Sequence, residues 1–304
     1  MKVSFFLIGV LVLGLTDGRA QGQYSVASYN LDNYRLRATS ARRARTAESR
    51  RAVVSVIHRS DADIVALQEV GSESALANLR ESLNRLGHRY AHSIFNRAPN
   101  QEIHCAILSR FPVVENRSEA TVEFELYGRQ FSVLRGICEV RIALRPDYHL
   151  TLVNLHLKSN LPVWYADPVD YRIAEAAIIR RRLDEILATG ANLIVAGDLN
   201  DSPGSITLRT VMGKGRRRLM DCRPEERFVT GTAPGGRITS GATWTHHYER
   251  RDEYYRYDYL LISDELKKHS VRGSASVPVF PKWKQASDHR LVLAEFVAGD
   301  GERP

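Results

Sequence analysis

The sequence predicts a single domain of the α/β (α+β) class. Apolar residues recur with helical spacing in some segments and with period-two alternation in others, and the two kinds of segment alternate along the chain. Several period-two runs follow one another closely, which favours antiparallel hairpins. No internal repeat and no linker rich in Pro, Gly or Ser divides the 304 residues. We therefore expect one domain over residues 21–298, followed by a flexible tail at 299–304.

In the N-terminal half, residues 24–29 are predicted to form a strand that is apolar on both faces. A helix is expected at 42–58, with apolar residues on one face and basic residues outside. A short buried strand at 63–67 is followed by a helix at 73–86, which Gly87 ends. Four strand-like runs come next, and Tyr127-Gly128 predicts a hairpin turn between two of them. These runs are 103–108, 113–125, 130–144 and 149–155.

The C-terminal half contains the clearest helical pattern, at residues 171–189, where the apolar residues form one face. A buried strand at 192–196 leads straight into the next polar motif. We expect a short helix from Gly204 and then an irregular basic segment to about Gly241. The chain closes with two further predicted strands, at 257–262 and 291–297.

The first 20 residues have the three parts of a secretory signal peptide. Lys2 precedes an apolar run at 5–15, and a polar stretch ends in the small-x-small pattern Gly18-Arg19-Ala20. The alternative is a membrane anchor, but the apolar run is too short to span a bilayer comfortably. No Cys lies at the cleavage point, which argues against a lipoprotein. We expect a secreted or periplasmic protein that has no membrane anchor after cleavage.

The chain has a formal net charge of +8, from 43 Lys and Arg against 35 Asp and Glu. Such a surface favours polyanionic partners such as nucleic acid or acidic lipid headgroups. The alternative is a charge that serves solubility alone.

Three Cys residues give neither a disulfide scaffold nor a zinc pattern, because no CxxC or HExxH occurs. In an oxidising compartment one bridge can form, and Cys105 and Cys138 lie in strand-like runs that could pair. The alternative is that these thiols are unpaired and buried. Cys222 is the third.

Five short polar motifs, each at the edge of an apolar run, carry the candidate chemistry. Together they supply several carboxylates, two Asn and two His from strand ends, which is the inventory for metal-assisted hydrolysis of a phosphate ester. The motifs are Ser28-Tyr29-Asn30, Leu67-Gln68-Glu69, Asn154-Leu155-His156, Gly197-Asp198-Leu199-Asn200 and Ser287-Asp288-His289, with Arg256-Tyr257-Asp258-Tyr259 before the last.

Two of these motifs indicate specific roles for their acids. Glu69 follows a fully apolar strand, where a carboxylate is costly to bury unless it binds a cation or a partner. Oxygen ligands suit magnesium, manganese or calcium rather than zinc; an exposed acid at a strand end is the alternative. Asp198 and Asn200 lie two residues apart in a turn, so Asp198 could take a proton from water while Asn200 orients a phosphoryl oxygen. A simple turn cap is the alternative.

The two His residues follow or precede predicted strands. Each could be a structural histidine, but Asp258 is available as a partner. An Asp that is hydrogen-bonded to one imidazole nitrogen fixes the tautomer and raises the basicity of the ring. The other nitrogen of His156 or His289 would then face a phosphate.

In this order, from about residue 24 to residue 297, the motifs resemble the endonuclease/exonuclease/phosphatase superfamily, and most closely an exported, bacterial-type, deoxyribonuclease-like member. This superfamily includes pancreatic-type deoxyribonuclease, abasic-site endonucleases, neutral sphingomyelinases and inositol-phosphate phosphatases. The resemblance implies a four-layer sandwich, in which two mixed β-sheets pack face to face with helices outside. It places the site in the groove between the sheet edges.

The resemblance also implies a metal site. Asn30 and Glu69 look like its central pair, and Asp288 looks like an acid near the metal. Asp32 matches an acid that some members carry two residues after that Asn. The expected ion is Mg²⁺ or Mn²⁺, with Ca²⁺ as a further option.

Five residues look like the catalytic group of the superfamily. His156 resembles the phosphate-contacting His of the middle strand. Asp198 resembles the residue that orients or deprotonates the attacking water, with Asn200 beside it. Asp258 resembles the partner of His289.

Other residues match less closely. Glu102 is the candidate for the Glu that supports the middle His in the deoxyribonuclease branch. Lys158 could contact a flanking phosphate, and Arg216, Arg217 and Arg218 form a basic loop that can follow a nucleic acid backbone. For all four basic residues a solvated loop is the alternative. The characteristic mid-chain Tyr of the abasic-site branch has no match here, which disfavours a DNA-repair role.

We therefore expect a divalent-metal-dependent phosphodiesterase that hydrolyses nucleic acid, an exported endonuclease acting as a monomer without a stable protein partner. The first alternative is a sphingomyelinase-like or phosphoinositide-directed hydrolase on the same fold. That enzyme should carry an exposed apolar loop for the bilayer, and the sequence shows none that is convincing. The second is a non-catalytic binding module, which has no need of the complete set of acids and histidines.

Overall fold

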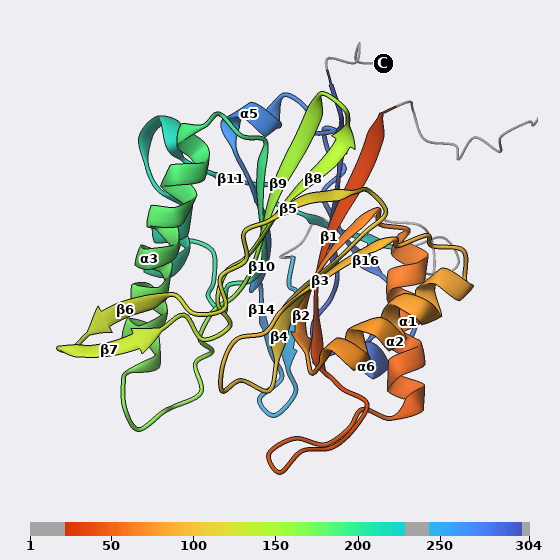
Figure 1. The fold of residues 1–304 in the computed structure, drawn as a ribbon. Helices are drawn as coiled ribbons and strands as arrows, with labels where there is room; N and C mark the ends of the chain where they lie inside the picture. The colour runs from red at the N-terminus through yellow and green to blue at the C-terminus, as the bar shows by residue number, and fades with distance from the viewer. Residues whose placement is uncertain (1–21, 229–242, 300–304) are drawn as a thin grey trace, which may run out of the picture.

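The computed structural model describes residues 22–228 and 243–299 (Figure 1). The predicted signal peptide at 1–20 lies outside the described residues, as do part of the expected basic segment and nearly all of the expected tail. Within the described ranges, no helix combines the length and the apolar character that a membrane crossing requires.

The first of two large mixed sheets has seven strands in the order β12-β16-β17-β1-β2-β4-β3. β1 pairs parallel with β2 and antiparallel with β17. The strands are β1 (Gln23–Tyr34), β2 (Ile64–Val70), β3 (His92–Asn96), β4 (His104–Ser109), β12 (Glu225–Phe228), β16 (Ser276–Val279) and β17 (Val292–Val297).

The second sheet has six strands in the order β11-β15-β10-β9-β8-β5. β9 and β10 are parallel, and the remaining pairs are antiparallel. The strands are β5 (Val113–Asn116), β8 (Cys138–Arg145), β9 (Tyr148–His156), β10 (Leu193–Asp198), β11 (Met220–Asp221) and β15 (Asp258–Ile262).

Helices cover the outer face of each sheet, as Figure 1 shows with α3 on one side and α1 and α2 on the other. On the first sheet lie α1 (Ala47–Ser60), α2 (Glu73–Arg85) and α6 (Trp283–Ala286); on the second lie α3 (Pro168–Ala188) and α4 (Ile206–Met212). Three apolar clusters fill the spaces between these layers, and the central one joins residues of both sheets. The four-layer sandwich expected from the resemblance is confirmed.

Small elements complete the chain. α5 (Asp264–Lys267) follows β15, and the short 3₁₀ helix η1 (Gly215–Arg217) follows α4. Two hairpins lie outside the large sheets, β6 (Glu123–Leu126) with β7 (Arg129–Ser132) and β13 (His246–Tyr248) with β14 (Glu253–Tyr255). The predicted turn at Tyr127-Gly128 joins β6 to β7, and both residues have positive φ, as a tight hairpin turn requires.

Some predicted boundaries were wrong. The expected helix at 42–58 begins at Ala47, because the side chain of Thr46 accepts a hydrogen bond from the backbone N–H of Ser49 and caps the helix there. Residues 35–46 form a loop instead. The expected strands 113–125 and 130–144 are each interrupted, so that β6 and β7 leave the sheet as a separate hairpin.

The cysteine alternatives are also resolved. Cys105 and Cys138 are both free thiols buried in the core between the sheets, and Cys222 is free as well. The bridge is not formed.

The sheet topology brings the polar motifs to one end of the sandwich. β1 and β2 are parallel and so are β9 and β10, so each pair carries its C-terminal motif to the same end of its sheet. In the second sheet, Asp198 is the register partner of both His156 and Asp258. We call this the site end. The opposite, far end holds the β8–β9 turn and α5, at the top of Figure 1.

Buried amides join the two sheets beneath the site end. Asn154 of β9 donates from Nδ2 to the carbonyl oxygens of Leu67 (2.8 Å) and Ala106 (2.9 Å) in the other sheet. Gln68 donates from Nε2 to Oδ1 of Asn154 at 2.7 Å. The β2–β4 register shifts after Leu67, and the amide contacts the backbone at this irregularity. These bonds hold the strand ends of both sheets at a fixed separation.

Candidate active site

Asp198 lies at the centre of the polar cluster, almost fully buried. Its Oδ2 accepts a hydrogen bond from Asn30 Nδ2 at 2.9 Å, which crosses between the sheets. Its Oδ1 accepts from the backbone N–H of Asn200 at 2.8 Å. Nε2 of His156 and Nε2 of His289 lie 3.6 and 3.7 Å from the same Oδ2. One carboxylate oxygen is thus shared by an amide and two imidazoles.

His289 pairs with Asp258 as the sequence predicts. Nδ1 of His289 and Oδ2 of Asp258 are 2.8 Å apart, and Asp258 is completely buried. Burial alone would lower the pKa of His289, but the carboxylates of Asp258 and Asp198 outweigh it and raise this pKa well above its ordinary value. The ring is therefore held as an imidazolium that faces Asp198.

His156 has the opposite electrostatic character. Burial, followed by the nearby charges of Arg135 and His289, lowers the pKa of His156 well below its ordinary value. The ring is neutral, and its Nδ1 is buried without a hydrogen bond to any described residue. The site therefore pairs one charged and one neutral imidazole around Asp198.

The pKa of Asp198 itself is raised to about 6. Burial is the largest cause; the charge of His289 opposes it, and the neighbouring Asp258 adds to it. A carboxyl group with such a pKa can accept a proton near neutral pH.

Glu69 and Asn30 lie at the adjacent ends of β2 and β1. The carboxylate of Glu69 is mostly buried, and its nearest ionic neighbours are distant: His156 Nε2 and Arg42 Nη1 each lie 3.9 Å away. It forms no hydrogen bond with the described residues. Among the described residues, Oδ1 of Asn30 accepts only the backbone N–H of Asp32, at 3.0 Å.

Further acids are crowded beside this pair. Burial, Asp288 and Glu69 together raise the pKa of Asp32 to about 6, although the guanidinium of Arg45 opposes them. Arg45 Nη1 lies 2.5 Å from Oδ2 of Asp32. Asp288 is half exposed, with Oδ1 4.0 Å from Nε2 of His289. A cation would relieve the repulsion among these acids, so the oxygen set of Asn30, Glu69 and the crowded acids fits a hard divalent ion.

Another group of possible ligand atoms is already engaged. Asp198, Asp258 and His289 lie within 4.8 Å of one another, but His289 and Asp258 are hydrogen-bonded together. Two of these three side chains are therefore already partners of each other within the protein.

The structure does not bring Glu102 to His156. Oε2 of Glu102 accepts from Thr39 Oγ1 at 2.9 Å and lies 3.7 Å from Arg35 Nη2 and 3.8 Å from Arg42 Nε. Glu102 precedes β4 in the first sheet, and these three residues of the neighbouring loop draw its carboxylate away from the middle strand.

Lys158 lies near the site, but its ammonium group is hydrogen-bonded within its own loop. The residue is buried, and Nζ donates to the carbonyl oxygens of Ser159 (2.8 Å) and Leu161 (2.6 Å). Asn200 is placed as expected, beside Asp198, with Nδ2 donating to the carbonyl of Leu157 at 3.0 Å.

The expected substrate-binding loop, with Arg216, Arg217 and Arg218, lies at the far end of the second sheet. It precedes β11, whose Met220 pairs with Ile262 at the far end of β15. Asp258 begins the same strand at the site end. Four residues of a strand span about 13 Å, so this loop lies away from the strand ends that carry the polar motifs, and its role in binding substrate stays a prediction.

Several residues at the site were not identified from the sequence. The ring of His246 lies 4.5 Å from that of His289 and stacks on Tyr257 at 5.3 Å. Oγ of Ser287 donates to the carbonyl of Asn30 at 2.8 Å and accepts from the N–H of His289 at 3.0 Å. Residues 35–46, which we call the arginine loop, carry five Arg beside Glu69 and Glu102.

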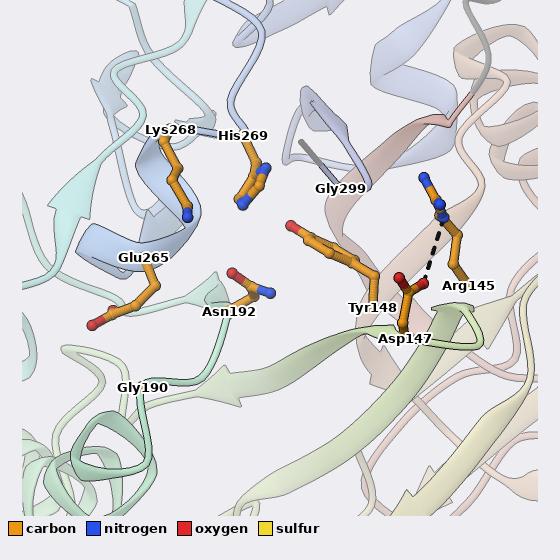
Figure 2. A pocket seen from close by; sticks show the side chains of 9 residues that line it. All are labelled: Arg145, Asp147, Tyr148, Gly190, Asn192, Glu265, Lys268, His269 and Gly299. Atoms are coloured by element: carbon orange, nitrogen blue, oxygen red, sulfur yellow. Dashed lines mark ion pairs between the residues drawn. The ribbon is translucent and has the colours of Figure 1, made fainter. Parts of the chain in front are cut away.

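A cavity of about 690 Å³ lies elsewhere, at the far end (Figure 2). Both signs of charge line it, and Arg145 Nε lies 3.7 Å from Asp147 Oδ1. None of the sequence-predicted site residues borders it. Its lining includes Tyr148, Asn192, Glu265, Lys268 and His269.

The chain was compared with known proteins. The model of the Endonuclease/Exonuclease/phosphatase family matches residues 27–289. No curated protein sequence matches the chain. Among solved structures, truncated TDP2 from Caenorhabditis elegans is 20% identical, with a TM-score of 0.59, over 91% of this chain and 98% of that chain.

Two further similar structures differ in their activity or bound ligand. The human Nocturnin catalytic domain with bound sulfate is 17% identical, with a TM-score of 0.61, over 92% of this chain and 96% of that one. Sphingomyelinase C from Streptomyces griseocarneus is 14% identical, with a TM-score of 0.58, over 90% and 99%. At these identities the likeness establishes the fold alone. The family match covers all five motifs and most of the chain, and it shows that the chain belongs to the endonuclease/exonuclease/phosphatase family.

Proposed function

We propose that this protein is an exported, divalent-metal-dependent phosphodiesterase that cleaves nucleic acid as an endonuclease. The observation that carries the hydrolytic part is the buried His289–Asp258 pair facing Asp198, next to the free carboxylate of Glu69. Members of this family are generally phosphoric ester hydrolases.

The cation would be held by Asn30 and Glu69 with Asp288 and Asp32 nearby, and it supplies Lewis-acid stabilisation of charge on a phosphoryl oxygen. The chain's own groups perform the remaining tasks. Asp198 accepts a proton from, or orients, the attacking water. The imidazolium of His289 and the amide of Asn200 donate hydrogen bonds to the phosphoryl oxygens, and Asp258 keeps the His289 ring charged and oriented.

The arginine loop supports nucleic acid as the substrate. Arg37 and Arg43 are exposed on it, and Arg42 reaches to 3.9 Å from Glu69. A polyanionic strand that crosses the site would meet these cations next to the scissile phosphate. The rings of His246 and Tyr255 both stack on the buried Tyr257, and these two partly exposed rings offer planar surfaces for bases.

The test is incubation of the purified protein with plasmid DNA, with RNA, and with vesicles that contain sphingomyelin or phosphoinositide. Each substrate is supplied with Mg²⁺, Mn²⁺, Ca²⁺ or a chelator. We expect nicked plasmid or shortened RNA, full loss of turnover in chelator and recovery with Mg²⁺ or Mn²⁺. Glu69→Ala should lose metal binding, measured by calorimetry, while its circular dichroism spectrum stays unchanged. Full activity in chelator would overturn the metal dependence.

A second candidate is hydrolysis of a phospholipid headgroup at a membrane surface. One observation favours it: residues 157–167, which follow β9 at the site end, expose Leu161 (70%) and Trp164 (91%). No convincing apolar loop was expected from the sequence, but these side chains make one. Exposed Trp and Leu suit the interface of a bilayer.

One double variant distinguishes the lipid candidate from the nucleic acid candidate. If the substrate is a lipid, Leu161→Ser with Trp164→Ser should abolish vesicle binding in a sedimentation assay and slow vesicle hydrolysis, while hydrolysis of a small soluble phosphodiester continues. If the substrate is nucleic acid, the same double variant should cleave plasmid DNA or RNA at the wild-type rate. Turnover of sphingomyelin with no cleavage of DNA or RNA would refute the nucleic acid assignment.

A further inference from the structure

Arg135 places a buried guanidinium at the site end. It lies in the connection between β7 and β8 and is 8% exposed. The one hydrogen bond that the guanidinium group forms with a described residue is long, from Nη1 to the carbonyl oxygen of Leu157 at 3.4 Å. Nε is buried without any partner there, and Nη2 forms no bond with the described residues. No carboxylate of the described chain lies within 4 Å of the group.

The other buried arginines behave differently. Each of them forms an ion pair with a carboxylate, and Arg35, Arg172 and Arg180 also donate hydrogen bonds to carbonyl groups. These pairs are Arg35–Glu102 (3.7 Å), Arg172–Asp201 (3.3 Å), Arg180–Asp184 (2.5 Å) and Arg290–Glu226 (2.7 Å). Burial of an unpaired charge is costly, whereas burial of a paired and hydrogen-bonded charge is tolerated. Within the described residues, Arg135 alone among these five forms no ion pair within 4 Å, although its charge helps to lower the pKa of the buried Glu175.

The groups around Arg135 indicate where an anion that pairs with it would lie. The carbonyl of Leu157 receives both Arg135 Nη1 and Asn200 Nδ2, so the guanidinium and this amide converge on one point next to His156. The positive charge of Arg135 is felt at His156, where it helps to lower the pKa of the ring. The guanidinium thus lies on the side of His156 and Asn200, where the proposed function places the phosphoryl oxygens.

We propose that Arg135 binds a non-bridging oxygen of the substrate's phosphate group, and that the phosphate forms the close ion pair that this guanidinium lacks in the free protein. A guanidinium can present two parallel N–H donors to phosphate, and Nε and Nη2 are the two without partners. This assignment rests on the proposed phosphodiesterase activity, but it does not depend on whether the phosphate belongs to a nucleic acid or to a lipid.

Inorganic phosphate is the probe, titrated in the presence of Mg²⁺ and again in chelator, with thermal unfolding and calorimetry as readouts. Phosphate should raise the Tm of the wild-type protein. Arg135→Met should weaken phosphate binding at least tenfold while leaving the Tm without phosphate unchanged or higher, because a buried unpaired charge is replaced by an apolar side chain of similar length. Arg135→Lys keeps the charge but loses the two parallel N–H donors of the guanidinium, so this variant should bind phosphate with intermediate affinity.

The matched control is Arg172→Met, at a buried arginine that already has its partner, Asp201. It should lower the Tm and leave the phosphate affinity of the folded protein unchanged. A structural role for Arg135 predicts the reverse pattern: a lower Tm for Arg135→Met with unchanged phosphate affinity, or variants that do not fold at all. Either result would overturn the proposal, as would a wild-type protein that does not bind phosphate. Phosphate binding that depends on Arg135, in a protein that cleaves neither DNA nor RNA, would support this proposal and reject nucleic acid as the substrate.

Discussion

The two ends of the sandwich differ in how deeply their charged side chains are buried. At the far end, the cavity of about 690 Å³ is lined by groups of both signs that remain close to water, with Arg145 beside Asp147 (Figure 2). At the site end, Asp198 and Asp258 are buried against two imidazoles, and Arg135 is buried without an ion pair within 4 Å among the described residues.

This difference teaches that buried charge locates the chemistry here better than open volume does. A large cavity is the usual first hypothesis for a site. In this fold the cavity lies behind the strand ends that carry no motif. The shifted pKa values of Asp198 and His289 belong to the other end, as do Nδ1 of His156 and Nε of Arg135, which have no hydrogen-bond partner among the described residues. If function follows the buried charges, substitutions at the site end should change it and substitutions at the cavity should not.

The largest expected effect concerns Asp258. Asp258→Asn keeps the shape of the side chain but removes the charge that supports an imidazolium at His289, so kcat should fall about 10²–10⁴-fold. The control is Asp147→Asn in the far-end cavity, which should leave kcat unchanged. Steady-state kinetics on the substrate found in the activity screen compare the two. A normal rate for Asp258→Asn would show that the His289–Asp258 pair has no catalytic role, and a loss with Asp147→Asn would favour the cavity.

The second effect is a pH dependence of stability at the site end. Glu175 of α3 is fully buried behind Lys158, and burial raises its pKa to about 7, against hydrogen bonds from the N–H groups of Leu134 and Lys158. The folded state then holds the proton more tightly than the unfolded state, whose pKa is near 4.5. Stability should therefore fall as pH rises from about 4.5 to about 7 and level off above, by on the order of 3 kcal/mol.

Urea unfolding at a series of pH values measures this fall. Glu175→Gln should flatten it, while Glu265→Gln at the far-end cavity should leave it intact. If both variants kept the wild-type slope, another group would be responsible for the pH dependence.

The smallest effect compares two arginine-rich segments. Arg42→Ala in the arginine loop should raise KM for nucleic acid about tenfold, the value of one charge-assisted hydrogen bond, and should flatten the dependence of log affinity on log salt. The triple change of Arg216, Arg217 and Arg218 to Ala should leave both quantities unchanged, because these residues are at the far end. The opposite pattern in filter-binding assays would support the original sequence interpretation.

The strand-end motifs were predictable for a physical reason. Each polar group follows an apolar run, and the carboxyl ends of parallel strands meet at one edge of a sheet. The family resemblance then supplied the order of the motifs and the layers, so the pairing of His289 with Asp258 and the position of Asn200 beside Asp198 could be expected.

The loops were less predictable, because local sequence does not say which sheet edge a loop adjoins. The helical spacing at 42–58 concealed the arginine loop, although Thr46, a good N-cap, marks the true start of the helix. The basic run at 216–218 has the composition of a nucleic acid contact, but the β11–β15 register places it at the far end. The ring of His246 and the isolated charge of Arg135 depend on contacts between distant segments, which no local pattern encodes.

Glu69 has one further consequence, through its backbone. It adopts a left-handed conformation, with φ of 61°, at the irregularity in β2. Side chains with a Cβ pay for that conformation by about 1–2 kcal/mol, and glycine does not. Evolution under heat stress alone would therefore drive this position towards glycine and discard the carboxylate. A population that keeps Glu69 through such selection is under selection for activity, so the identity of this one residue can report, in a laboratory evolution experiment, whether the enzyme is still in use.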